Sequence, residues 1–126
     1  MEMDEYIKSL LTQISESYNF LKERKDEPGD LDIIKVHLGK IQGVIKVLCN
    51  KIEALNNSSD RYSELLKLGK SYLQNYDFNK IIEAYEIYSE DVLRIKNIRI
   101  SILSSLEETK FIFKIQSMLR DLDSYG

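Results

Sequence analysis

Residues 34–55 read IKVHLGKIQGVIKVLCNKIEAL, and large aliphatic side chains recur in them at alternating intervals of four and three residues. This spacing, kept over three heptads, places the aliphatic side chains along one stripe of an α-helix. We expect Asp30 or Asp32 to cap the start of this helix. Because the stripe is long and apolar, it needs a partner helix to cover it. Its members are Ile34, Leu38, Ile41, Ile45, Leu48, Ile52 and Leu55.

The nearest candidate partner is the segment before it, from Asp4 to about Lys25. This segment has the same spacing of apolar residues, in the series Ile7, Leu11, Ile14, Tyr18 and Leu21. Its helix must end before Pro28-Gly29, because proline disfavours helical geometry in the residue before it and glycine permits a reversal of the chain. The short connection predicts an antiparallel hairpin of two helices.

A second hairpin is predicted over residues 61–90. The polar run from Asn56 to Asp60 is typical of a turn and supplies an N-cap for a helix over residues 61–74. Asn75 tolerates the left-handed conformation that closes a helix, and Asp77 can cap the next helix, which begins at Phe78.

The same stretch resembles a single tetratricopeptide repeat. The residues that carry the resemblance are Leu65, Leu68, Gly69, Tyr72, Asp77, Phe78, Ile82 and Tyr85. The resemblance implies that the second helix approaches closely at Gly69, while Tyr72, Phe78 and Tyr85 fill the groove between the two helices. The sequence departs from the repeat at Tyr76, where glycine is usual, and at Ile81 and Tyr88, where alanine is usual. No second copy lies about 34 residues away, and an ordinary helical hairpin is the alternative.

The last third of the chain admits three interpretations. The helical pattern from Phe78 continues without a break as far as Ser104-Ser105, and beyond it the apolar stripe moves to the opposite side. In the first interpretation a fifth helix begins near Ser105, where Ser105-x-x-Glu108 is a capping box. Alternatively, one long helix buries opposite sides at its two ends. The third interpretation is a β-hairpin around residues 106–108, with alternating apolar residues at 98–102 and 111–115.

Length and composition predict one domain over residues 1–126, folded as an all-α antiparallel bundle of four to five helices in two stacked hairpins. The 126 residues are 43% hydrophobic and carry a net charge of −3, which does not suggest a dedicated nucleic-acid or membrane-surface protein. The single Cys permits no internal disulfide. The acidic start of the chain differs from a signal or transit peptide, and we expect a cytoplasmic protein.

Reactive side chains are scarce, and we expect no enzyme, no cofactor and no metal site. His37 and Cys49 lie twelve residues apart on one predicted helix, about 18 Å along its axis, too far for a nucleophile and base pair. The acidic run from Asp26 to Asp32 does not fit a calcium loop, because His37 stands where a bidentate Glu belongs. No glycine-rich loop suited to phosphate occurs.

Charge alternates along the chain. The net charge is −5 over residues 1–34, +3 over 35–56, −3 over 57–91 and +2 over 92–126. Alternation of this kind suits antiparallel neighbours. The basic residues are candidate phosphate contacts, with a solvated face paired to acidic neighbours as the alternative. They are Lys35, Lys40, Lys46, Lys51, Arg94, Lys96 and Arg99.

We therefore expect a non-catalytic adaptor or subunit that binds a protein partner, or a second copy of itself, by helix packing. The predicted contact surface is the second apolar face of the C-terminal region, formed by Ile100, Phe111, Ile115, Met118 and Leu119. The alternative is that these residues complete the core of the monomer. A different class of function, an accessory subunit of a nucleic-acid-processing complex, would use the basic faces. No small-molecule ligand is evident.

Overall fold

The structure is a computed structural model that describes residues 2–55, 60–88 and 90–125, and every regular element in these ranges is helical. This confirms the predicted all-α class. Two short 3₁₀ turns, Asp60–Tyr62 and Glu86–Tyr88, adjoin the longer helices. The α-helices are α1 (Glu2–Glu23), α2 (Asp30–Ala54), α3 (Ser63–Asn75), α4 (Asn79–Tyr85), α5 (Val92–Glu108) and α6 (Phe111–Tyr125).

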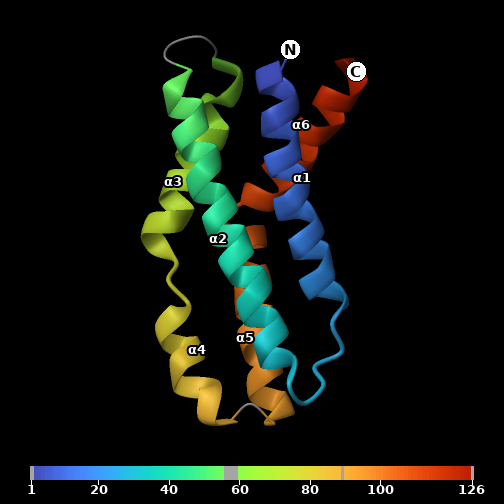
Figure 1. Cartoon of the computed structure of the whole chain (residues 1–126), viewed down its shortest axis with the longest axis vertical. Coiled ribbons are helices and arrows are strands. Elements are labelled where there is room, and N and C mark those ends of the chain that lie inside the picture. The colour runs from blue at the N-terminus through green and yellow to red at the C-terminus, as the bar shows by residue number, and fades with distance from the viewer. Residues whose placement is uncertain (1, 56–59, 89, 126) are drawn as a thin grey trace.

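The α-helices of the described residues are arranged as antiparallel rods (Figure 1). Helices α1 and α2 are one rod each, α3 and α4 follow one another along the third rod, and α5 and α6 along the fourth. Figure 1 shows α1 and α2 side by side on one side of the molecule, with α5 and α6 behind them. The predicted antiparallel bundle is confirmed, and its two hairpins are α1 with α2 and the third rod with the fourth.

The α1–α2 hairpin forms as its spacing predicts. The stripe of α2 is buried along its length except at Leu55, which is partly buried, and the matching residues of α1 are buried against it. Gly29 makes the turn with a φ of 89°. Asp30 does not cap α2; its carboxylate instead accepts the backbone N–H of Glu27 and a hydrogen bond from Arg24.

A hairpin within residues 61–90 is not formed, and that prediction is wrong. Tyr76 is extended, with φ −124° and ψ 112°, so α4 continues along the direction of α3 instead of folding back on it (Figure 1). Asn75 remains helical and does not adopt the left-handed conformation. The backbone N–H of Asn79 donates to the carboxylate of Asp77 at 3.0 Å, as expected of a residue that starts a helix.

The helix predicted to run from Phe78 to Ser104 is interrupted. Helix α4 ends at Tyr85, and α5 begins at Val92 after Asp91, whose side chain accepts the backbone N–H groups of Leu93 and Arg94. Asp91 followed by two apolar residues is an N-cap signal, but the unbroken apolar spacing around it hid the break.

The fourth rod bends between α5 and α6. Lys110 takes a left-handed conformation with a φ of 67°, so the new helix starts at Phe111 and not near Ser105. The predicted helix break followed by a new helix is therefore confirmed, but the break lies about five residues later than predicted. The single long helix and the β-hairpin are both wrong, because residues 98–102 lie in α5 and 111–115 in α6. The bend turns the displaced apolar stripe back toward the core.

Candidate functional site

The predicted contact surface of the C-terminal region is largely buried in the monomer. Phe111 and Ile115 are fully buried, Met118 is nearly so, and Leu119 packs partly buried against the same core. The alternative given by the sequence, that these residues complete the core, describes four of the five. Only Ile100 remains on the surface, with 43% of its area exposed.

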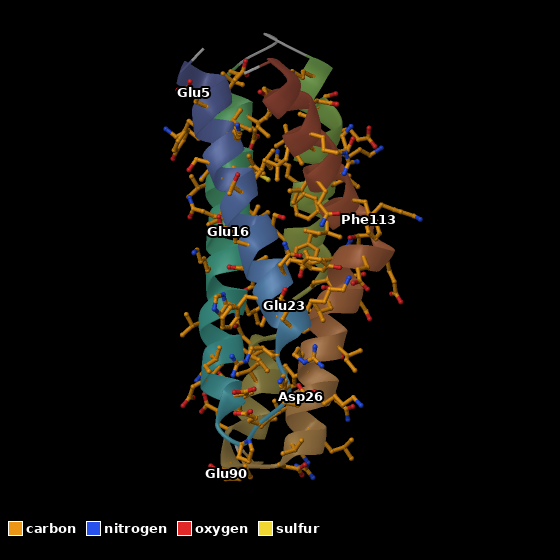
Figure 2. All side chains as sticks on the ribbon, turned by 90° about the vertical axis from the view of Figure 1, so that its right-hand side faces the viewer. Glu5, Glu16, Glu23, Asp26, Glu90 and Phe113 are labelled. Atoms are coloured by element: carbon orange, nitrogen blue, oxygen red, sulfur yellow. The ribbon has the colours of Figure 1, made fainter. Side chains whose placement is uncertain are left out.

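Apolar side chains that face solvent lie instead along the outer side of α5. Leu93 is 66% exposed, and Ile100, seven residues later, lies on the same face of the helix. Phe113, at the start of α6, is 49% exposed. Figure 2 places Phe113 at the edge of the molecule formed by α5 and α6. We call Leu93, Ile100 and Phe113 the α5 surface.

A second group of exposed apolar side chains belongs to the α1–α2 hairpin. Tyr6 and Phe20 come from α1, and Val36 and Val47 come from α2. Each is at least partly open to solvent, and Val36 is the most exposed of the four. We call these four residues the hairpin surface. The hairpin surface lies on α1 and α2, while the α5 surface lies on the fourth rod, formed by α5 and α6.

Three of the predicted phosphate contacts pair with acidic side chains of the same chain. Lys35 binds Glu86, Arg94 lies 3.3 Å from Asp91, and Arg99 binds Asp26. The other four are exposed, but Lys40 and Lys51 share one stripe of α2, Lys46 lies on another face of α2, and Lys96 lies on α5. The structure does not bring the seven together as one site.

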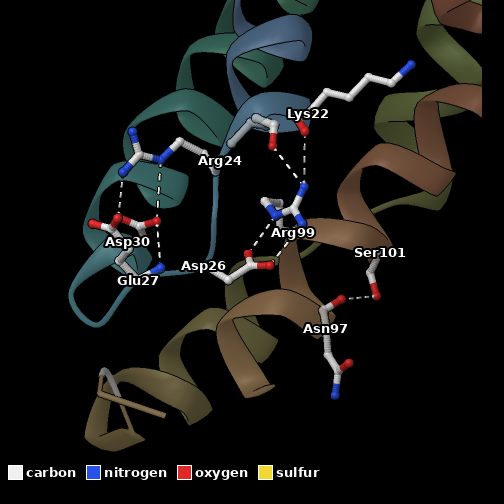
Figure 3. A network of polar contacts seen from close by, with 9 residues as sticks. Lys22, Arg24, Asp26, Glu27, Asp30, Asn97, Arg99 and Ser101 are labelled. Carbon is white, nitrogen blue, oxygen red and sulfur yellow. Dashed lines mark hydrogen bonds and ion pairs between the residues drawn. The ribbon is translucent and has the colours of Figure 1, made fainter. Parts of the chain in front are cut away.

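Arg99 has a structural role in the loop between α1 and α2 (Figure 3). Its guanidinium donates to both carboxylate oxygens of Asp26, at 2.6 and 2.9 Å, and to the backbone carbonyl of Leu21 at 3.1 Å. Arg99 thus satisfies a carbonyl at the end of α1 and neutralises a buried carboxylate. Beside it, hydrogen bonding to Arg24 holds the pKa of Asp30 below its usual range.

The hydroxyl groups of buried tyrosines form hydrogen bonds across the core. Tyr18 donates to Glu107 at 2.5 Å, Tyr62 donates to Asp4, and Tyr72 is 2.9 Å from the Ser105 hydroxyl. Burial is the main cause that raises the pKa of each of the three tyrosines to about 12. In the described part of the chain, every buried side-chain polar atom has a hydrogen-bond partner. These groups therefore contribute to packing specificity and offer no unpartnered atom to a ligand.

His37 and Cys49 lie apart, as their spacing predicts. His37 stacks on Phe20 with ring centroids 4.2 Å apart, and its Nδ1 is 3.2 Å from the Ser17 hydroxyl. Burial, with the nearby positive charges of Lys40 and Arg24, lowers the pKa of His37. Cys49 is buried, and burial raises the pKa of its thiol. Among the described residues, no three His, Cys, Asp or Glu side chains cluster as a metal site would require.

An open groove of about 410 Å³ lies beside α2 where α3 ends and α4 begins. It is lined by Gly39, Gln42, Gly43, Lys46, Leu73, Tyr76, Asp77 and Asn79. Tyr76, whose extended backbone separates α3 from α4, is one of its lining residues. No helix in the described ranges combines the length and apolar character that crossing a bilayer requires.

No protein-family model, no curated protein and no solved structure matches the chain. These comparisons do not test the resemblance of residues 61–90 to a tetratricopeptide repeat, which stays a prediction, but the hairpin that it implies is not formed, because α4 does not fold back on α3.

Proposed function

We propose that the protein is a non-catalytic helical subunit that binds a protein partner through the α5 surface. The observation that carries the proposal is that the side chain of Leu93 is 66% exposed on α5, a helix whose inner side is buried in the core. Ile100 extends the same face by two turns, and Phe113 adds an aromatic side chain at its end. A helix face of this kind suits packing against a helix of another protein.

The α5 surface replaces most of the predicted surface and keeps one of its residues, Ile100. Phe113 belongs to a residue type that is enriched at the cores of interfaces. Lys96, exposed on the outer side of α5, would lie at the rim of such a contact and favour an acidic partner.

The test compares single charged substitutions of equal size. Leu93→Glu and Ile100→Glu add one negative charge to the α5 surface, and Gln74→Glu adds one to the exposed side of α3 as the matched control. Each purified protein, checked for helicity by circular dichroism, is used to capture partners from a lysate of the source cells. The captured partner is then produced alone, and its dissociation constant for each variant is measured by calorimetry.

We expect one partner that binds the unmodified chain and Gln74→Glu equally, and that binds Leu93→Glu and Ile100→Glu at least about tenfold more weakly, equivalent to about 1.4 kcal/mol. A partner that binds all four proteins alike would contradict the proposal. So would the recovery of no partner by the unmodified chain.

The nucleic-acid alternative is decided by a separate measurement. Fluorescence anisotropy of a labelled DNA duplex or RNA strand at 50 mM salt would show binding that weakens steeply as salt is raised, if the exposed lysines contact phosphates. We expect no binding, because Lys35, Arg94 and Arg99 are already paired with carboxylates.

A further inference from the structure

The hairpin surface carries charges of opposite sign on its two helices, and the lysines of α2 lie between its valines and α1. Glu5, Glu16 and Glu23 are 11 and 18 residues apart on α1, so they share one stripe opposite the core. Figure 2 shows these three glutamates spaced along α1. On α2, Lys40 and Lys51 are 11 residues apart and share a stripe next to Val36 and Val47.

Three of the charges at the hairpin surface have no ion-pair partner among the described residues. Glu5, Glu16 and Lys40 form no ion pair with any described residue, and Lys51 lies over the ring of Tyr6, 5.5 Å from its centroid. Figure 1 shows no other helix in front of α1 and α2. Val36, Val47 and the glutamate stripe are therefore open to a second molecule, while Lys51 lies over the ring of Tyr6, and His37 and Arg24 lie against the ring of Phe20.

The register of the two helices places these charges at matching levels. Tyr6 lies beside Lys51, and Phe20 stacks on His37. Because α1 and α2 are antiparallel, each step forward along α1 corresponds to a step back along α2. Glu5 is therefore level with Lys51, and Glu16 with Lys40, each to within about one residue, or about 1.5 Å of helix rise.

We infer that a second copy of this chain docks on the hairpin surface about a two-fold axis parallel to the helices. Rotation about such an axis places α1 of each copy over α2 of the other. It leaves every residue at the same height along the axis. Glu5 then faces Lys51 of the partner subunit, and Glu16 faces Lys40 of the partner subunit, and each pairing occurs twice. Tyr6, Phe20, Val36 and Val47 of both copies supply the apolar part of the contact. The contact is isologous and closes as a dimer.

The area of the hairpin surface suits such a contact. Helix α1 has 22 residues, which at 1.5 Å per residue gives about 33 Å of length. Two adjacent helices of about 10 Å diameter give a face of roughly 700 Å² per partner. A stable protein interface buries about 800 Å² per partner, so the two helices together supply close to the required area.

The first measurement is the mass in solution, by light scattering behind a sizing column over a range of concentrations. We expect a species of twice the 14.8 kDa chain mass. The double variants Glu5→Lys with Glu16→Lys, and Lys40→Glu with Lys51→Glu, place like charges against each other across the two-fold axis. Each should shift the mass to that of one chain, with unchanged helicity by circular dichroism.

Mixing the two double variants tests the geometry. In the mixture positions 5, 16, 40 and 51 are all Lys in one copy and all Glu in the other, so both halves of the contact are again complementary. We expect a heterodimer of one chain of each kind, detected by native mass spectrometry, that dissociates as salt is raised. A mixture that stays monomeric would overturn the two-fold arrangement.

The matched control is Lys67→Glu with Lys80→Glu, which makes the same change of charge on exposed positions of α3 and α4. This variant should remain dimeric. An unmodified chain that is monomeric at every concentration overturns the inference, as does a dimer that both double variants leave intact. The inference does not depend on the proposed function, because Leu93→Glu should leave the dimer mass unchanged, and loss of the dimer leaves the α5 surface to be tested separately.

Discussion

Asp26 adopts a left-handed backbone conformation, with a φ of 59°, and holds the largely buried guanidinium of Arg99. The exposed fractions of the two side chains are 10% and 11%. Asn tolerates this backbone conformation but lacks the negative charge, so Asp26→Asn removes the counter-charge without new strain. Because an unpaired buried charge is costly, we expect the free energy of unfolding in urea to fall by about 3 kcal/mol.

The control for Asp26→Asn is Glu86→Gln, which makes the same change in the exposed pair with Lys35. Exposed pairs contribute about 0–1 kcal/mol, so this variant should unfold at nearly the urea concentration of the unmodified chain. Equal losses for the two variants would contradict the structural role assigned to the Asp26–Arg99 pair.

His37 makes stability depend on pH. It is the one histidine of the chain, and its pKa in the folded state is lowered mainly by burial. The unfolded chain, with an ordinary histidine pKa of about 6.5, then binds more protons than the folded chain, so stability is lost as the pH falls through this value. We expect the melting temperature to drop between pH 7.5 and 5.5, and to drop less for His37→Gln. Parallel profiles for the two proteins would show that other groups cause the loss.

At the scale of elements, the close approach of α3 to α2 depends on Gly69. A Cβ atom at this position would lie 2.8 Å from the Sγ of Cys49, and Ile45 and Phe111 confine it on the other sides. The small residue singled out by the sequence therefore does permit close packing, but against α2 and not against α4. Helix α3 packs on α2 and α6, which is why its inner face is apolar.

Gly69→Ala should lower the free energy of unfolding by about 1–3 kcal/mol through overpacking. Adding Cys49→Ala removes the sulfur that the new methyl group meets. The free energy of unfolding of the double variant should therefore be about 1 kcal/mol higher than the sum of the two single effects predicts. Chemical denaturation of the three variants gives the coupling directly.

Gly43→Ala is the matched control for Gly69→Ala, because nothing lies within 4 Å of its added Cβ. It should stabilise the helix by about 0.5–1 kcal/mol. Destabilisation by Gly43→Ala, or purely additive effects at Gly69 and Cys49, would contradict the packing described.

Local patterns were sufficient for the α1–α2 hairpin and for α3, which was predicted over residues 61–74, and insufficient for the bounds of α4, α5 and α6. The stripe from Ile34 to Ile52 repeats over many turns, so its buried face was evident from spacing alone. The ends of α4 and α5 depend on single residues. Asp91 interrupts an apolar pattern that continues in phase through it, and Lys110 takes a left-handed conformation that lysine rarely adopts. Neither produces a run of turn residues that a spacing argument would detect.

At the scale of the whole molecule, the partner of each apolar face was beyond the reach of the sequence. The apolar stripes on the two sides of Ser105 point in opposite directions, as their spacing indicates, but only the bend at Lys110 turns the second stripe inward. The predicted contact residues Phe111, Ile115 and Met118 are therefore core residues, and Leu93, whose exposure spacing did not predict, lies on the surface. Spacing identifies a face, while tertiary structure determines what covers it.

Helix α6 completes the core, packing against α1, α3 and α5, and Phe111 begins this contact. Phe111 is fully buried, with its ring 5.8 Å from that of Tyr72. We expect Phe111→Ala to lower the free energy of unfolding by about 3–5 kcal/mol, a large share of the roughly 5–15 kcal/mol that holds a domain of this kind together. Urea denaturation and near-ultraviolet circular dichroism would measure the loss.

Phe113→Ala makes the same change two residues away, at a side chain that is half exposed. Because little packing is lost there, it should cost about 0.5 kcal/mol or less and keep the near-ultraviolet signal. Equal costs at the two positions would mean that α6 does not meet the core at Phe111. The pair of variants also separates stability from binding, since Phe113 belongs to the α5 surface: a variant that folds normally but loses the partner assigns the defect to the surface alone.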